Sequence, residues 1–342
     1  MIVFADLRWP DKTGIGVVKQ EVLRRAPKSV EIIDLKVKGS IGSPYSPIAI
    51  SKALSGRHAA HGVFWSPGFV PPAYSRIPSI VTVHDLTHLH FYSRFHTAYY
   101  NWIFRRLYRK CANVVCVSEY TSQEFAEWSG IPRNKVATIH NGVSDAFRDA
   151  KSIPHFSFPY VLYPGNHRSY KNTDRLLLAY SKSALPRNGI HLVFTGAPQF
   201  KLQSAAAKLG VSDLVHFVGE VTDAVIINLY KGALFVAFVS LYEGFGLPIV
   251  EAMMAGVPVL TSNAAAMPEV AGNAALLVDP HSVESIVDGL NVLAFDSKER
   301  GIRIQLGRER VKLFSWDVAA AKLWTIVDSA GQDTIRSGTA AT

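Results

Sequence analysis

Residues 241–280 read LYEGFGLPIVEAMMAGVPVLTSNAAAMPEVAGNAALLVDP, and the pattern within them indicates the fold class. A glycine-rich turn leads into a helix predicted over 249–255, and Gly256-Val257-Pro258-Val259 ends that helix and begins a strand over 258–261. Another short apolar run follows at 275–278. Short apolar runs that alternate with helices are typical of parallel βαβ units.

The same alternation extends through the rest of the chain. Further helices are predicted at 172–183, with Asn172 as a possible cap, and at about 317–330. The predicted strands cover residues 2–5, 30–34, 62–65, 79–84, 113–117, 160–163, 191–195, 215–218, 234–239, 258–261 and 275–278. The sequence therefore predicts an α/β protein with doubly wound parallel sheets.

The length of the chain predicts two domains. Its 342 residues exceed the roughly 250–300 at which a single core stops growing. The charged, proline-containing stretch 151–159 is typical of a linker, so we expect domains at 1–153 and 154–316. Two such sheets are expected to face a central cleft where ligands bind.

The charge is distributed unevenly. Residues 1–155 contain 20 Lys and Arg against 11 Asp and Glu, which accounts for the whole net charge of +9. An anionic partner, nucleic acid or membrane surface, is indicated for that half. The two cysteines are too few for a disulfide framework, and no run reaches the roughly 18 apolar residues of a membrane span. Because Asp6 and Arg8 interrupt any leader-like start, we expect a cytoplasmic protein.

Two carboxylates, Glu243 and Glu251, bracket the turn Gly244-Phe245-Gly246-Leu247-Pro248. Glycines allow the backbone to approach a ligand closely, and the amides at the start of the following helix favour an anion. The Glu251 carboxylate, about one turn into the helix, can accept hydrogen bonds from paired hydroxyls. Each glycine alone is explained by a turn, but a turn does not explain the pair of carboxylates.

This segment closely resembles the signature of the retaining glycosyltransferases of family 4, which have the two-Rossmann architecture called GT-B. The resemblance implies that Glu243 lies by the donor sugar and that Glu251 holds the ribose hydroxyls. It also implies that backbone amides of Gly244, Phe245, Gly246 and Leu247 bind the sugar or phosphate of a nucleotide sugar.

Residues 163–172 resemble the phosphate loop of the same family. A strand end, Gly165, and Lys171 before a helix favour pyrophosphate. The chain departs from the common pattern in that Asn166 stands where many members have Arg. Arg168 is the candidate for that second cation, with a solvated loop charge as the alternative.

Other segments extend the resemblance over most of the chain. Residues 82–86 (TVHDL) place His84 and Asp85 at a strand end, where the family has a His beside the transferred sugar. Gly14 and Gly16 resemble the loop under the phosphates, and Val221 follows the strand end where the nucleobase packs. Residues 314–316 resemble the start of the closing helix, so 317–342 are expected to pack back onto the first domain.

The resemblance implies retention of anomeric configuration, with His84, Asp85 and Glu243 as the catalytic candidates. We expect Glu243 to bind the sugar and not to act as a covalent nucleophile. No Asp-x-Asp triplet occurs, so no metal cofactor is expected, and lysine and helix amides would stabilise the leaving diphosphate.

The chain is similar to bacterial mannosyl- and rhamnosyltransferases of surface-polysaccharide synthesis, which favours GDP-mannose as the donor over UDP-glucose or dTDP-rhamnose. The acceptor is expected to be a glycan or a lipid-linked glycan. A sugar-nucleotide epimerase or a phosphorylase on the same fold is the alternative activity, and a non-catalytic binding module is a further one.

Residues 90–110 (HFYSRFHTAYYNWIFRRLYRK) contain five Lys and Arg, no acidic residue, and eight Phe, Tyr and Trp. Phe95, Tyr99, Trp102 and Arg106 recur at helical spacing. One interpretation is a core helix with a basic outer face, and the other is a peripheral contact with anionic membrane on the inner face of the plasma membrane. No nucleic-acid motif accompanies the charge, so no nucleic-acid partner is expected.

Overall fold

The computed structural model describes residues 1–55, 62–151, 153 and 155–339. The chain divides into two compact units. Unit 1 comprises Met1–Gly142 together with Ser315–Thr342, and unit 2 comprises Val143–Phe314. Each unit contains one six-stranded sheet.

The unit boundary lies at Gly142, not at residue 153 as the sequence predicts. Phe147, in the short helix α7 (Ala146–Asp149), packs edge-on against Tyr230 with ring centroids 5.2 Å apart. These contacts hold the residues after Gly142 in unit 2.

The predicted linker 151–159 belongs to unit 2 as well, and its residues 152 and 154 lie outside the described part of the chain. Phe158 stacks on His191 with ring centroids 3.8 Å apart. The prolines and charges of this stretch predict a linker, but its aromatic side chains pack on the sheet.

The sheet of unit 1 is parallel, with strand order β2-β1-β3-β4-β5-β6. Its central strands are fully buried runs of Val, Ile, Phe and Trp, as expected for a sheet covered on both faces. Its strands are β1 (Ile2–Ala5), β2 (Glu31–Asp34), β3 (Gly62–Ser66), β4 (Ser79–Val83), β5 (Asn113–Cys116) and β6 (Val136–Thr138). The sequence does not predict β6, which has three half-buried residues and a weak apolar signal.

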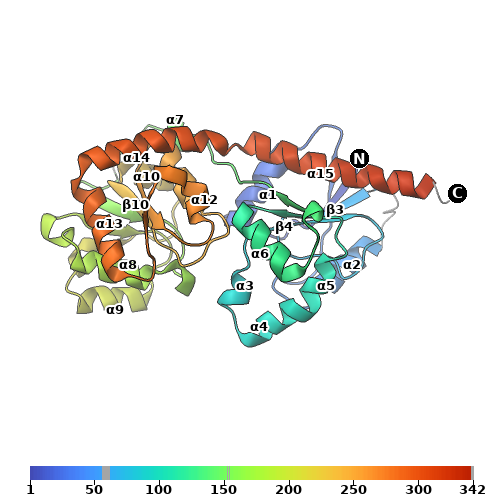
Figure 1. Cartoon of the computed structure of the whole chain (residues 1–342), viewed down its shortest axis with the longest axis horizontal. Helices are drawn as coiled ribbons and strands as arrows, with labels where there is room; N and C mark the ends of the chain where they lie inside the picture. The colour runs from blue at the N-terminus through green and yellow to red at the C-terminus, as the bar shows by residue number, and fades with distance from the viewer. Residues whose placement is uncertain (56–61, 152, 154, 340–342) are drawn as a thin grey trace. The chain divides into compact units, whose positions relative to one another are not determined.

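The helices of unit 1 lie on both faces of this sheet (Figure 1). They are α1 (Gly14–Arg24), α2 (Ser46–Ser55), α3 (Thr87–His90), α4 (Arg94–Tyr99), the π-helical turn η2 (Tyr100–Phe104), α5 (Arg105–Tyr108), α6 (Glu119–Ser129), the 3-10 turn η3 (Arg133–Lys135) and α15 (Trp316–Thr339). From α4 to α5 the chain forms one helical segment with a π-turn in its middle.

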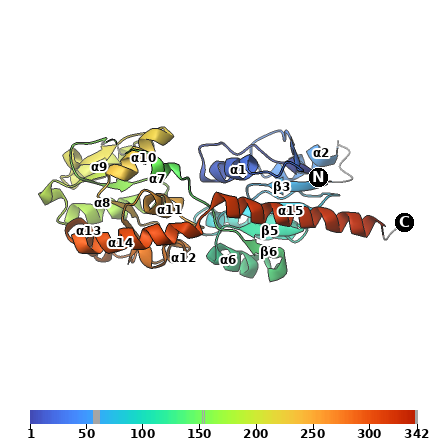
Figure 2. The same ribbon diagram turned by 90° about the horizontal axis from the view of Figure 1, so that it is seen from above.

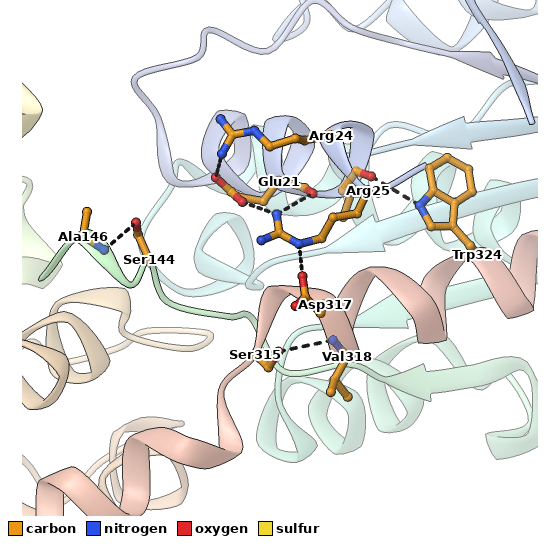
Figure 3. Close-up of polar contacts among 10 residues, drawn as sticks. Glu21, Arg24, Arg25, Ser144, Ala146, Ser315, Asp317, Val318 and Trp324 are labelled. Atoms are coloured by element: carbon orange, nitrogen blue, oxygen red, sulfur yellow. Dashed lines mark hydrogen bonds and ion pairs between the residues drawn. The ribbon is translucent and has the colours of Figure 1, made fainter. Parts of the chain in front are cut away.

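Helix α15 lies beside α1 and across β3 and β5, as Figures 1 and 2 show. The Trp324 indole N–H donates to the carbonyl of Val22 at 3.3 Å, and Trp324 packs edge-on against Trp65. Figure 3 shows that Arg25 donates to Asp317 at the start of α15 and also to Glu21. Sequence-distant residues of the C-terminal helix therefore complete the core of unit 1.

The sheet of unit 2 is also parallel, with strand order β12-β11-β10-β7-β8-β9. If β7 is numbered as strand 1 and the sheet is read from β9 to β12, the strand order is 3-2-1-4-5-6. This is the strand order of the Rossmann fold. Its strands are β7 (Tyr160–Tyr163), β8 (His191–Phe194), β9 (Val215–Phe217), β10 (Phe235–Phe238), β11 (Val259–Ser262) and β12 (Leu276–Val278). Five of the six fall within the predicted strands, and β11 extends one residue past the predicted range 258–261.

Unit 2 has a larger set of helices, among which α8 and α13 pack side by side (Figure 2). They are η4 (Ser169–Lys171), α8 (Thr173–Lys182), η5 (Pro186–Asn188), α9 (Phe200–Lys208), η6 (Ser212–Leu214), α10 (Asp223–Gly232), α11 (Leu247–Met254), α12 (Met267–Ala271), η7 (Gly272–Ala274), α13 (Val283–Phe295), α14 (Ser297–Arg310) and η8 (Val311–Leu313), in addition to α7.

Asn172 precedes α8 as predicted, but its side chain does not cap the helix. It adopts a left-handed backbone conformation (φ = 61°), and its Nδ2 donates to the carbonyls of Val239 and Pro280 at 2.9 and 2.8 Å. Asn172 thus joins the ends of two strands next to Lys171.

Candidate functional site

The strand order of unit 2 locates a crevice between β7 and β10. The connections leave these neighbouring strands toward opposite sides, and ligands of such sheets bind beyond the carboxyl ends of the strands at that switch point. The loops after β7 and β10 carry most of the residues that the sequence predicts for the donor.

Lys171 and Glu243 meet at this switch point. Lys171 Nζ lies 2.7 Å from Glu243 Oε1, and each side chain is 13% exposed. The ammonium also lies over the rings of Tyr170 and Phe238, at 5.4 and 5.2 Å from their centroids. The ion pair is therefore held in place, and two of the three ammonium protons can still meet another acceptor.

The phosphate loop has a strained glycine at its start. Gly165 has φ = 128°, and its amide donates to the hydroxyl of Thr195 at 2.8 Å. Asn166 Oδ1 accepts from the amide of Arg168 at 3.3 Å, which closes a local turn. Asn166 and Arg168 are both exposed, so the departure from the common pattern leaves one exposed guanidinium at this loop.

Helix α11 starts at the glycine-rich turn. Gly246 precedes it with φ = 96°, a conformation that L-residues rarely adopt, and Pro248 lies in its first turn. The Phe245 ring is buried and packs edge-on against Phe314 with centroids 5.6 Å apart. This packing anchors the turn from Gly244 to Leu247 through the side chain of Phe245.

Glu251 lies one turn into α11, where Tyr230 of α10 donates to its Oε2 at 2.6 Å. Burial raises the pKa of Glu251, and the hydrogen bond from Tyr230 opposes that shift. The sequence does not predict Tyr230, because its position follows from the packing of α10 on α11 and not from any spacing.

Val221 is half-buried and follows the end of β9. Just before it, Gly219 has φ = 71°, and its carbonyl accepts from the amide of Gly196 at 2.9 Å. A side chain on Gly219 would meet no heavy atom within 4 Å, so the surface here is open backbone. This arrangement suits close approach of a flat ring.

His84 directly follows β4 in unit 1. Its Nε2 lies 2.7 Å from the carbonyl oxygen of Pro67, so the proton is on Nε2, and Nδ1 is left as an acceptor. Burial lowers the pKa of His84, which keeps the ring neutral near pH 7.

Asp85, predicted beside it, is bound within its own turn. Its Oδ1 accepts from the amide of Thr87 at 2.9 Å and from the Thr87 hydroxyl. The carboxylate therefore fixes the start of α3.

The glycines of the first loop have different roles. Gly14 begins α1, and the Thr13 hydroxyl caps that helix by accepting from the amide of Gly16 at 3.0 Å. A side chain on Gly16 would lie 2.0 Å from the carbonyl oxygen of Pro10. Gly16 is therefore required for the loop before α1 to pack against the helix.

The sequence also does not predict the ion pair that holds this loop. Arg8 donates to Asp6 through Nη2 at 2.7 Å and through Nε at 2.8 Å, and Asp6 is 1% exposed. The same guanidinium reaches Ser46 Oγ at 2.7 Å and the carbonyl of Gly39 at 3.1 Å. One buried pair thus joins three loops at this edge of the sheet.

Two further properties bear on the chemistry. Within the described residues, no group of three or more His, Cys, Asp and Glu side chains is placed to hold a metal ion. Among the helices that the structure describes, none combines the length and the apolar character needed to cross a bilayer.

Two family models match the chain. One, described as "Glycosyl transferases group 1", matches residues 146–310. The other, described as "Glycosyltransferase Family 4", matches residues 44–147. The two matches adjoin near the unit boundary at Gly142.

Curated relatives match at modest identity. The O-antigen chain mannosyltransferase B of Escherichia coli is 27% identical over 217 residues, which cover 60% of this chain and 57% of that protein. The MMP alpha-(1->4)-mannosyltransferase of Mycolicibacterium hassiacum is 34% identical over 165 residues, covering 47% of this chain and 40% of that protein. The chain thus spans about half the length of these relatives.

Solved structures match over nearly the whole chain. HepE from Anabaena, in complex with UDP and glucose, has a TM-score of 0.75 at 17% identity, covering 96% of this chain and 99% of that one. WaaG, a glycosyltransferase involved in lipopolysaccharide biosynthesis, has a TM-score of 0.74 with the same identity and coverage. The predicted GT-B fold of two Rossmann-like domains is confirmed.

Proposed function

Since the chain belongs to the glycosyltransferases that the group 1 and family 4 models describe, we propose that it is a hexosyltransferase. It moves a hexose from a nucleotide sugar to a glycan or lipid-linked glycan in cell-surface polysaccharide synthesis, lipopolysaccharide included. The observation that carries this proposal is the Lys171–Glu243 ion pair beside the start of α11 at the switch point of unit 2.

Different residues of unit 2 bind different parts of the donor. Lys171 and the amides from Gly244 to Leu247 stabilise the charge that develops on the leaving diphosphate, and Arg168 adds a second cation. Glu243 accepts hydrogen bonds from sugar hydroxyls, and Glu251 accepts them from the ribose. The nucleobase packs beside Val221, on the open backbone of Gly219, and Gly165 belongs to the phosphate loop.

Unit 1 supplies the acceptor side. His84, neutral and fixed by Pro67, offers Nδ1 to a hydroxyl near the sugar being transferred. Gly14 and Gly16 are assigned to phosphate binding in this proposal. Transfer is retaining and needs no metal, because lysine and helix amides take the place of a cation at the leaving group.

The donor is GDP-mannose in this proposal, supported by relatives named as mannosyltransferases. UDP-glucose and dTDP-rhamnose are the alternatives. A thermal-shift screen against GDP, UDP and dTDP separates them, because stabilisation by a ligand rises with its affinity. We expect GDP to give the largest shift, and a larger shift with UDP or dTDP would reject mannose as the sugar.

Turnover is tested next. GDP-mannose with excess EDTA should be consumed only when an acceptor is added, and NMR of the product should show a retained anomeric configuration. Consumption without acceptor would favour an epimerase, and a pyridoxal absorbance would favour a phosphorylase. Loss of turnover in EDTA that Mg²⁺ restores would refute metal-independent transfer.

We further propose that residues 90–110 contact anionic membrane at the cytoplasmic face, chiefly through their exposed aromatic rings and Arg106. Phe95 is 88% and Trp102 64% exposed, and Arg106 stacks on the Trp102 ring at 5.3 Å. Arg105 and Arg109, in contrast, donate to the carbonyl of Ser129 and serve the fold. Apolar aromatic rings with a basic neighbour suit the lipid interface.

The membrane proposal is tested by vesicle flotation. Phe95→Ser with Trp102→Ser should abolish flotation with phosphatidylglycerol-containing vesicles. The control, Phe200→Ser with Phe295→Ser, removes two exposed rings from unit 2 and should leave flotation unchanged. If both double variants floated as well as the unsubstituted protein, the proposal would be contradicted.

A further inference from the structure

Unit 1 has a switch point of its own, between β1 and β3. Its strand order β2-β1-β3-β4-β5-β6 makes these two strands neighbours, with their connections on opposite sides. The loop after β1 carries Trp9, and β3 runs into residues 66–69, here called the 66–69 turn. No site residue that the sequence predicts lies in this turn, and Trp9 is not among the predicted site residues.

Contacts join these residues into one cluster. Trp9 packs edge-on against Phe69 with ring centroids 5.5 Å apart. A side chain on Gly68 would lie 2.1 Å from Trp9 Nε1, so this glycine allows the indole to reach the turn. On the other side of the turn, the carbonyl oxygen of Pro67 accepts a hydrogen bond from His84 Nε2. The ring centroids of Phe69 and His88 lie 6.1 Å apart.

Three polar atoms in this cluster are buried and unpaired. Within the described residues, Trp9 Nε1, Ser66 Oγ and His88 Nε2 have no hydrogen-bond partner. Ser66 is fully buried and His88 is 6% exposed. Buried polar groups without partners destabilise a fold, so a ligand that hydrogen-bonds to Trp9, Ser66 and His88 would stabilise this cluster.

The cluster carries no unpaired cation. Burial lowers the pKa of His88 to about 4 and also lowers that of His84, so both rings are neutral near pH 7. Nearby, Arg8 is paired with Asp6, and Lys19 with Asp11. The cluster therefore suits a neutral polar ligand better than a phosphate.

Aromatic rings complete the surroundings. Trp9 and Phe69 are half-buried, and the His88 ring stacks on Tyr100 with centroids 3.6 Å apart. Sites for neutral ligands commonly combine aromatic walls with a few polar atoms that fix orientation. A pyranose ring has both an apolar C–H face and a rim of hydroxyls that donate and accept.

We propose that Trp9, the 66–69 turn and His88 form a carbohydrate subsite that holds a neutral sugar of the acceptor. Its hydroxyls pair with Trp9 Nε1, Ser66 Oγ and His88 Nε2, and its apolar face packs on Trp9 and Phe69. Sugar binding follows from this cluster, and only its assignment to the acceptor rests on the proposed function.

Variants separate a ligand-binding role from a structural one. Trp9→Phe and Ser66→Ala remove unpaired polar atoms and should raise the Tm of the full chain while weakening sugar binding about fivefold, the loss of one hydrogen bond. The control is Thr82→Val, because the Thr82 hydroxyl is buried in the same sheet but accepts from Trp65 Nε1 at 3.3 Å. It should lower the Tm and leave sugar binding unchanged.

The probes are methyl α-mannoside, methyl α-glucoside and inorganic phosphate at millimolar concentration, observed by saturation-transfer NMR. We expect signals from a glycoside that weaken in Trp9→Phe and Ser66→Ala. Unaltered glycoside signals in both variants, or a response to phosphate alone, would overturn the inference. Binding of GDP, UDP and dTDP is measured in parallel: if the unsubstituted chain bound none of the three, the proposed function would be rejected, whereas nucleotide binding without any glycoside signal would reject this subsite alone.

Discussion

The switch points of the two sheets differ in their chemistry. In unit 2 the loops after β7 and β10 bring together opposite charges, Lys171 and Glu243, next to a helix start. In unit 1 the loops after β1 and β3, together with α3, bring together indole, hydroxyl and imidazole groups without net charge. Parallel sheets with similar topology thus present a charged crevice in one unit and a neutral, aromatic one in the other.

This difference shows how two sheets of similar topology can distinguish the donor from the acceptor of a transfer reaction. A diphosphate needs cations and amides, whereas a sugar needs hydrogen bonds and apolar ring faces. The net charge of +9 does not reveal this division, because the cations nearest to the unit 1 switch point are already paired with Asp6 and Asp11.

The largest expected effect follows from removing the cation of unit 2. Lys171→Met should lower affinity for GDP about 100-fold, because a charged hydrogen bond to phosphate is lost. It should also lower the free energy of unfolding by about 1–3 kcal/mol, since Glu243 is left half-desolvated and unpaired. Calorimetric titration and urea unfolding measure the two effects.

A second variant separates binding from folding. Lys171→Met with Glu243→Gln should recover most of the stability but none of the affinity. Lys201→Met is the control, because Lys201 is 75% exposed and its pair with Asp174 lies on the surface. Unchanged GDP affinity in Lys171→Met would remove the charged half of the comparison.

The neutral crevice makes a prediction about pH. The pKa of His88 is about 4 in the fold against 6.5 in the unfolded chain, so below pH 6.5 only the unfolded chain takes up the proton. Stability from this residue is complete above pH 6.5 and is lost as the pH falls toward 4. Between pH 7.5 and 5 the loss should be about 2 kcal/mol.

Urea unfolding at both pH values tests this, with His88→Phe as the comparison. The variant keeps the stacking on Tyr100 and lacks the titrating nitrogen, so its loss of stability with acid should be smaller by that amount. An equal loss in both proteins would mean that the pKa of His88 is not lowered in the fold, so that the ring takes up its proton there as readily as in the unfolded chain.

The sequence predicts the sheets well because buried parallel strands are continuous runs of Val, Ile and Phe, a local signal. It does not predict β6, where only three half-buried residues carry that signal. The sequence places a domain boundary at residue 153, whereas the compact units divide at Gly142, because the contact of Phe147 with Tyr230 joins residues far apart in the chain.

The same distinction separates the predicted and unpredicted site residues. Lys171, Glu243 and Glu251 lie in segments with recognisable glycine and proline spacing. Trp9 and Ser66 come together only through strand order, and Tyr230 only through helix packing. Neither strand order nor packing leaves a spacing pattern in the sequence.

A smaller effect is expected from the support of Glu251. Tyr230→Phe removes the hydrogen bond to Oε2 and should lower affinity for GDP about fivefold, with a stability loss of about 1 kcal/mol. Tyr180→Phe is the matched control, since the Tyr180 hydroxyl donates to the carbonyl of Ile190 at 2.8 Å in the same unit. Equal losses of affinity in the two variants would show that Tyr230 acts through folding only.

The smallest effect on kcat is expected from substitution of Asp85. This substitution tests whether a charged side chain of unit 1 takes part in catalysis. Asp85→Asn keeps the oxygen that accepts from Thr87, so the turn before α3 stays intact. We expect kcat to change by less than about threefold, because a residue that acts only through its own turn has no part in transition-state stabilisation. Glu243→Gln, measured beside it with GDP-mannose, should reduce kcat far more. A fall of kcat by about 100-fold in Asp85→Asn, with an unchanged unfolding curve, would place a catalytic carboxylate in the crevice of unit 1 and contradict its neutral character.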